Sequence, residues 1–235
     1  MKVYKFGGTS VGSPANMRAV MEIITPGEPK IVVLSAMSGT TNSLVEIGET
    51  LAKGDKQGAI SLIKKLEEKY HTVVDELYKT DEYKQLGESV IAAQFGVLYN
   101  QVEGDFNAVK EQIILAQGEL ISTALVTYLL QEEGYKAALL PALDFMRIDE
   151  DKQADVPLIT KLIKPIVEAA GNQQIYITQG FICRNAQGDI DNLQRGGSDY
   201  TATLIGAAIQ SEEVQIWTDI DGIHNNDPRF VSNTK

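Results

Sequence analysis

Five short apolar runs return along this chain, and stretches with helical spacing separate them. They are KVYKF at 2–6, KIVVLSA at 30–36, AALLP at 137–141, QIYITQGFI at 174–182 and VQIWT at 214–218. Several are apolar almost throughout, which is typical of strands buried on both faces rather than on one. The sequence therefore predicts an α/β fold, with a mainly parallel central sheet covered by helices on both sides.

The segments between these runs have the periodicity of helices. Residues 42 to about 130 are mostly helical in pattern, with apolar residues three and four apart and charges between them, as in AISLIKKLEEKYHTVVDELY. We therefore expect a helical insertion around residues 42–133. Further helices are expected from Ser13-Pro14, over 156–169 and from Ser198. The acidic stretch 143–157 is typical of a mobile loop, and no linker or repeat divides residues 1–235 into separate domains.

Charge and cysteine content exclude several classes of protein. The formal net charge is −11 and no basic run occurs, so bulk nucleic-acid binding is not expected. No uninterrupted apolar run approaches the ~18 residues that span a bilayer, and the N-terminus turns polar too early for a secretory signal. The single cysteine, Cys183, fits a small core residue of a strand and excludes an internal disulfide. We expect a cytoplasmic protein without membrane or nucleic-acid partners.

The first motif, KFGGTSVGS, joins a strand to paired glycines. Bare backbone there lets N–H groups approach a phosphate closely. Gly7, Gly12 and Ser13 nearly match a P-loop, but the lysine that should follow the second glycine is absent and Lys5 precedes the glycines instead. A tight strand-to-helix turn with a surface lysine explains the same residues.

Two further motifs place small or acidic residues where a ligand could bind. In LSAMSGTTN, Ser38 and Thr41 follow a buried strand, where they could donate to a ligand or cap the next helix. In QGELIST, Gly118 lies inside a helical pattern at a cost of ~1 kcal/mol, which indicates close approach by another backbone or a ligand. Glu119 beside it could pair with a substrate ammonium or remain solvated.

The last two motifs lie towards the end of the chain. In RGGSDYTA, Arg195 and the start of a helix both suit an anion, whereas Asp199 could serve only as a first-turn acid. The segment WTDIDGIHNNDPR is rich in aspartate, but Gly222 comes too early for an EF-hand loop. His224 is then a turn residue or a ring contact rather than a metal ligand, and no resident metal site is predicted.

Together these small-residue turns, each following an apolar strand and supplied with a few cations and acids, favour a phosphate-handling enzyme. The runs KFGGTSV, VVLSAMSGTTN, GELIST, ITQGFI, RGGSDYTA and WTDIDGI...DPR also resemble the catalytic domain of aspartokinases, in the amino-acid kinase family, in order and approximate spacing. The resemblance covers nearly the whole chain. It implies an αβα sandwich that uses Mg-ATP to convert L-aspartate to 4-phospho-L-aspartate, the first step towards lysine, threonine and methionine.

The resemblance also implies roles for individual residues. Lys5 and Asp199 would be catalytic, with Lys5 on the reacting phosphate oxygens. The nucleotide side would comprise Lys5, Phe6, Gly7, Gly8, Thr218, Asp219, His224 and Arg229. The substrate side would comprise Ser38, Thr41, Glu119, Phe181, Arg195, Gly196, Gly197 and Ser198. The N-terminal part would serve mainly the substrate and the part from about residue 175 mainly the nucleotide, and the full-length enzyme is expected to be a homodimer.

Three departures from the family pattern qualify this expectation. Gln194 stands where the family usually has glycine, and His224 where it often has tyrosine. The chain also ends at Lys235, before a lysine-bearing segment of the nucleotide site and the regulatory ACT domains. Two alternatives therefore remain: another amino-acid kinase of this fold, or a fragment that binds substrate without full activity. Glu119 with Arg195 favours an amino-acid substrate over a nucleoside monophosphate.

Overall fold

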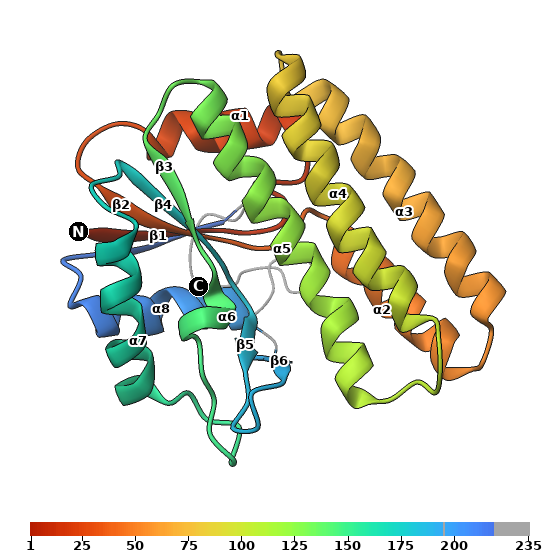
Figure 1. Ribbon diagram of the computed structural model, residues 1–235. Coiled ribbons are helices and arrows are strands. Elements are labelled where there is room, and N and C mark those ends of the chain that lie inside the picture. The colour runs from red at the N-terminus through yellow and green to blue at the C-terminus, as the bar shows by residue number, and fades with distance from the viewer. Residues whose placement is uncertain (195, 219–235) are drawn as a thin grey trace, which may run out of the picture.

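The computed structural model describes residues 1–194 and 196–218 (Figure 1). Strands and helices alternate along much of this length, as the apolar runs predict. The strands are β1 (Lys2–Phe6), β2 (Lys30–Leu34), β3 (Ala137–Leu140), β4 (Ile175–Gln179), β5 (Ile182–Arg184), β6 (Ile190–Asn192) and β7 (Val214–Trp217). The helices are α1 (Pro14–Ile24), α2 (Thr40–Ala52), α3 (Lys56–Leu77), α4 (Asp81–Gln101), α5 (Ala108–Glu132), α6 (Ala142–Phe145), α7 (Val156–Ala169) and α8 (Gly197–Ile209).

Five of the strands form one parallel sheet in the order β3-β4-β2-β1-β7. The central strand β2 is buried at every position, and β1 pairs with β2 on one side and β7 on the other. Because all five strands run the same way, their carboxyl ends meet at one edge of the sheet. Segments that follow different strands are therefore brought together there, which is where open α/β sheets bind ligands.

Alternate residues of β2 enter two different hydrophobic cores. Val32 and Leu34 belong to the core shared with α1–α5, whereas Ile31 and Val33 belong to the core shared with α6, α7 and α8. Figure 1 shows α7 and α8 on one side of the sheet and α1 and α5 on the other. The predicted three-layer αβα sandwich is confirmed.

The helical insertion is also confirmed, as the four helices α2–α5. They pack on one another beside the sheet, and α5 joins them to it (Figure 1). Among the described residues, α5 is long and apolar enough to cross a membrane by length and composition, although no uninterrupted apolar run predicted this. In the fold 72% of its most apolar stretch is buried, as in the core helix of a globular domain.

Two local predictions are wrong. The run QIYITQGFI is not one strand, because β4 ends at Gln179 and β5 pairs antiparallel with β6 in a separate two-stranded sheet. Phe181 lies between the two strands with φ +68°, a left-handed conformation that no strand can contain.

The acidic stretch 143–157 is not a free loop. Its apolar side chains Phe145, Met146 and Ile148 are buried, and backbone hydrogen bonds join Met146 and Ile148 to Arg184 of β5. The burial of those apolar residues outweighs the acidic composition around them. Cys183, on the same strand, is buried as predicted, and burial raises the pKa of its thiol to about 12.

Candidate functional site

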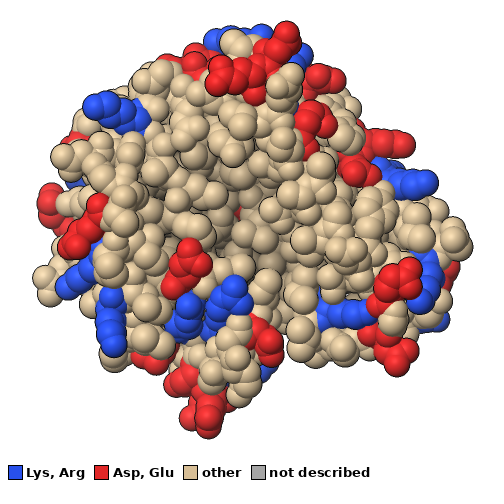
Figure 2. All heavy atoms as spheres, viewed as in Figure 1, with Lys and Arg blue, Asp and Glu red and all other residues tan. Residues whose placement is uncertain are grey.

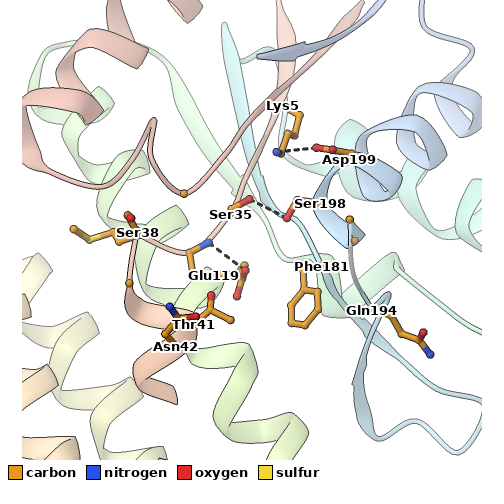
Figure 3. A pocket seen from close by; sticks show the side chains of 16 residues that line it. Lys5, Ser35, Ser38, Thr41, Asn42, Glu119, Phe181, Gln194, Ser198 and Asp199 are labelled. Carbon is orange, nitrogen blue, oxygen red and sulfur yellow. Dashed lines mark hydrogen bonds and ion pairs between the residues drawn. The ribbon is translucent and has the colours of Figure 1, made fainter. Parts of the chain in front are cut away.

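A cavity of about 420 Å³ opens at the carboxyl edge of the sheet. Its walls come from the ends of β1 and β2, from α5, from the segment before β5 and from the start of α8 (Figure 3). The lining residues are Lys5, Gly8, Ser35, Ala36, Met37, Ser38, Gly39, Thr41, Asn42, Glu119, Phe181, Gln194, Gly196, Gly197, Ser198 and Asp199. Figure 2 shows charged side chains mostly towards the rim of the displayed face. Charged side chains that line a cavity are therefore stronger candidates for contact with a ligand.

Lys5 and Asp199 form an ion pair across this cavity. The Nζ of Lys5 lies 2.7 Å from Oδ1 of Asp199, with side-chain exposures of 12% and 52% (Figure 3). The two residues are 194 positions apart, and they meet because α8 packs beside β1. The Asp199 carboxylate therefore pairs with Lys5 and does not cap the helix. The pair places a basic side chain inside a cavity of a protein whose formal net charge is −11.

The first turn of α8 offers backbone to the cavity. Gly196 precedes the helix in a left-handed conformation, φ +77°, and no side chain among the described residues caps the helix. The hydroxyl of Ser198 is 3.0 Å from that of Ser35, which links α8 to the end of β2. A helix start without a side-chain cap leaves N–H groups and a partial positive charge for an anion.

The segment 35–42 forms the opposite wall. Ser38 and Thr41 both line the cavity, and α2 begins without a side-chain cap after Gly39, whose φ is +80°. The alternative in which these hydroxyls only cap the next helix therefore does not describe this fold. Gly8 lies close behind the segment, because a Cβ on it would be 2.8 Å from the carbonyl oxygen of Ala36.

Glu119 is buried at the floor of the cavity and is not solvated. The residue is 4% exposed, and its Oε1 accepts a hydrogen bond of 3.1 Å from the backbone N–H of Ala36 (Figure 3). Its Oε2 is buried and has no partner among the described residues. Burial raises the pKa of Glu119 to about 7, although the Ala36 hydrogen bond acts to lower it. An unpartnered carboxyl oxygen in a cavity is suited to a ligand cation.

Gly118 explains how the two walls come together. A Cβ at this position would be 2.7 Å from the Cβ of Ala36 and 3.4 Å from Cγ2 of Thr40. The predicted close approach inside the helix is thus made by the segment that follows β2. The missing side chain lets α5 approach closely enough for Glu119 to bond Ala36.

Phe181 and Gln194 close the remaining side with strained backbone. Both are in the left-handed region, with φ +68° and +60°. The Phe181 N–H donates to Thr201 of α8, and the Gln194 N–H donates to the Asn192 side chain. Such conformations cost of order 1 kcal/mol for residues with a side chain. Gln194 therefore occupies a backbone conformation that a glycine would adopt without strain.

The other predicted site residues lie elsewhere or outside the described residues. Phe6 is 1% exposed and its ring stacks on Trp217, with centroids 5.6 Å apart. Phe6 and Thr218 line a separate cavity of about 240 Å³ beside α1, while Gly7 borders the Lys5 ammonium without lining the main cavity. Arg195, Asp219, His224 and Arg229 lie outside the described residues.

Sequence reasoning missed several lining residues: Ser35, Ala36, Met37, Gly39 and Asn42. All of them lie in the motif LSAMSGTTN or directly beside the two residues chosen from it. The signal was therefore the position of the whole segment after a buried strand, rather than the hydroxyl groups alone.

A parallel sheet whose carboxyl edge holds a lysine, an uncapped helix start and a buried carboxyl defines an α/β protein whose cavity is suited to small charged ligands. The sequence pattern of the amino acid kinase family matches residues 1–235. The chain therefore belongs to the amino acid kinase family.

Individual relatives agree with this assignment. Lysine-sensitive aspartokinase 3 of Escherichia coli (strain K12) is 32% identical over 99% of this chain and 52% of its own, and an aspartokinase of Chlamydia pneumoniae is 31% identical over 99% and 50%. The crystal structure of E. coli aspartokinase III in complex with aspartate and ADP superposes with a TM-score of 0.82, at 29% identity, over all of this chain and 53% of that one. The resemblance to aspartokinases is confirmed, and this chain spans about half the length of these relatives.

Proposed function

We propose that this chain carries the amino-acid side, and part of the phosphate side, of an ATP-dependent kinase that phosphorylates the side-chain carboxylate of L-aspartate. The observation that carries the proposal is the cavity that holds Glu119, the Lys5–Asp199 pair and the start of α8 within one space. The similar E. coli enzyme was crystallised with aspartate and ADP, the two kinds of ligand that such a cavity would take.

The chemistry explains why these residue types are needed. The attacking carboxylate has an ordinary pKa near ~4, so at neutral pH it needs no general base. The barrier is the approach of one anion to the γ-phosphate of another, and charge neutralisation with alignment lowers it. Lys5 supplies the positive charge, and Asp199 holds its ammonium in place at 2.7 Å. Glu119 receives the α-ammonium of the amino acid on its unpartnered Oε2.

ATP with Mg²⁺ is the proposed phosphoryl donor. Among the described residues no group of three or more histidine, cysteine or acidic side chains could hold a resident ion. Mg²⁺ in kinases is usually held by one or two carboxylates together with the nucleotide phosphates, and the exposed Asp199 carboxylate fits such a partial role. The Mg²⁺ would neutralise phosphate charge, while Lys5 and the first turn of α8 orient the oxygens that this chain reaches.

A direct assay tests the proposal. The chain is incubated with Mg-ATP, L-aspartate and hydroxylamine, which traps an acyl phosphate as a hydroxamate. We expect product from aspartate and a loss of on the order of 10³-fold in Lys5→Met, because the charge on the transferring phosphate is then uncompensated. The matched control is Lys2→Met, in the same strand, where the lysine pairs with Glu28 and Glu213 instead.

Three outcomes separate the alternatives. Product from glutamate or another acid, and not from aspartate, would overturn the substrate assignment and favour another amino-acid kinase. Calorimetric binding of aspartate without binding of ATP would favour a fragment that holds substrate without turnover. The nucleotide side from about residue 175, the homodimer, the cytoplasmic location and the lysine, threonine and methionine pathway remain parts of the same proposal.

A further inference from the structure

The helical bundle contacts the amino-acid side of the cavity through two neighbouring residues of α3. The hydroxyl of Tyr70 is 2.8 Å from Oγ1 of Thr40, and both residues are 0% exposed. The Nζ of the adjacent Lys69 donates to the carbonyl oxygen of Ser38 at 3.2 Å. Thr40 and Ser38 lie in the segment 35–42, which forms one wall of the cavity.

Thr40 is packed between Tyr70 and α5. Its Cγ2 would be 3.4 Å from a Cβ on Gly118, and the residue after Gly118 is Glu119. Burial raises the pKa of the Tyr70 phenol, the Thr40 hydrogen bond acts to lower it, and the charge of Glu119 adds a smaller raising effect. Tyr70, Thr40, Gly118 and Glu119 thus form a continuous contact from the bundle to the floor of the cavity.

We propose that Tyr70 is a positioning residue for the amino-acid side of the site, because its hydroxyl fixes Thr40 and thereby holds the segment 35–42 against Gly118 and Glu119. The Tyr70 ring is already anchored without that hydroxyl, since it packs edge-on against Phe95 of α4 with centroids 5.9 Å apart. The hydroxyl therefore acts on Thr40 rather than on the ring's own packing. The inference rests on the proposed function, because it assigns Tyr70 a part in binding the amino acid.

The test is Tyr70→Phe, which keeps the ring and removes one hydroxyl. The Thr40 hydroxyl is then buried without its partner and will move to find another, which costs more than the bond itself was worth. We expect the KM for aspartate to rise about tenfold, with kcat and the KM for ATP changed less than twofold. Tyr70 touches neither ligand. A change confined to the KM for aspartate, with kcat and the KM for ATP nearly unchanged, would therefore indicate a positioning role.

A second variant separates positioning from general damage. In Tyr70→Phe combined with Thr40→Val the hydrogen bond is still missing but no buried hydroxyl is left unpartnered, so positioning predicts that the KM for aspartate stays raised about tenfold. A return to the parent value would attribute the rise to the unpartnered Thr40 hydroxyl and overturn the positioning role. The matched control is Tyr78→Phe, which removes another buried hydroxyl bond of 2.8 Å, to the carbonyl of Leu125. It should lower the melting temperature and leave the KM for aspartate unchanged.

Hydrogen exchange without ligand distinguishes failure of this inference from failure of the proposed function. The Ala36 amide, which bonds Glu119, should exchange faster in Tyr70→Phe, and it should exchange equally fast in the double variant, which still lacks the hydrogen bond to the segment. If the parent makes no acyl phosphate from aspartate, the proposed function fails. The exchange result still tests whether Tyr70 positions the segment 35–42. Equal Ala36 exchange and unchanged aspartate KM in Tyr70→Phe would overturn the positioning role.

Discussion

At the scale of single residues, Glu119 has the most unusual environment in the cavity. It is a carboxyl group at 4% exposure, with one oxygen bonded to Ala36 and the other without a partner in the part of the chain that the structure describes. Burial stabilises its neutral form, which is why its pKa rises to about 7 from an ordinary value near ~4.3. An incoming ammonium reverses that preference, because it pairs only with the ionised carboxylate.

This environment predicts that aspartate binds more tightly as pH rises. The pKa of Glu119 is about 7, so most of its carboxyl is protonated at lower pH. The affinity for aspartate should therefore increase about tenfold between pH 6 and pH 8 and then level off. Folding stability should change in the opposite direction. The contribution of the neutral carboxyl is complete below pH ~4.3 and is lost as pH rises through about 7. Calorimetric titrations with aspartate across this range measure the first effect, and chemical denaturation the second.

The control for this prediction is Glu119→Gln. The amide keeps the size of the side chain but does not titrate, so its weaker aspartate binding should be independent of pH over the same range. Parallel pH curves for the parent and Glu119→Gln would show that the titrating group is not Glu119.

At the scale of elements, the contact between α5 and the segment after β2 sets the geometry of the site. This contact has no room for a side chain at Gly118, where the nearest atom to an added Cβ is the Cβ of Ala36 at 2.7 Å. That atom is attached directly to backbone, so it cannot turn aside as the end of a long side chain can. The two elements must separate to accept any larger residue.

Gly118→Ala is therefore expected to destabilise the protein, although alanine is the better helix former by ~1 kcal/mol. Overpacking of this kind costs about 1–3 kcal/mol, and separation of the two elements should also weaken aspartate binding. Gly96→Ala is the matched control in α4, because an added Cβ there meets nothing within 4 Å. Gly96→Ala should raise the midpoint of urea unfolding, and Gly118→Ala should lower it. A higher midpoint in both would contradict the close approach.

Elements differ in how far the sequence predicts them. The strands β1, β2, β3, β4 and β7 were predicted because each is a short apolar run, although only β2 and β4 are buried at every position. Lys5 and Ser38 were found because they lie at or just after the ends of such runs. The break at Phe181 was not predicted, since its left-handed φ depends on contacts with Thr201 far along the chain. Tyr70 was also missed, because a buried tyrosine with helical spacing looks like ordinary core. Glutamate is rarely buried, so the residue type alone did not predict the burial of Glu119.

At the scale of the whole molecule, one sheet serves two hydrophobic cores. Leu34 faces the core shared with α1–α5, and Ile31 of the same strand faces the core shared with α7 and α8. Loss of either core would expose one face of every central strand. The two layers of helices are therefore expected to depend on each other for stability.

This arrangement predicts one cooperative unfolding transition for the described part of the chain. Leu34→Ala and Ile31→Ala should each lower the free energy of unfolding by about 2–5 kcal/mol and shift the same transition. The measurement is differential scanning calorimetry, followed in parallel by far-ultraviolet circular dichroism. If Ile31→Ala splits the curve into two transitions while Leu34→Ala does not, the two cores unfold separately.

The pairing of β1 with β7 has a consequence for how the protein is made. Val3 lies opposite Val214, so one edge of the first strand has no partner until more than 200 further residues have left the ribosome. At 5–20 residues per second that interval is about 10–40 s, during which the edge of β1 is open to other chains. The Lys5–Asp199 pair depends on the same late arrival of α8. Lys5 is thus synthesised nearly 200 residues before Asp199, and its surroundings are completed only when α8 packs beside β1.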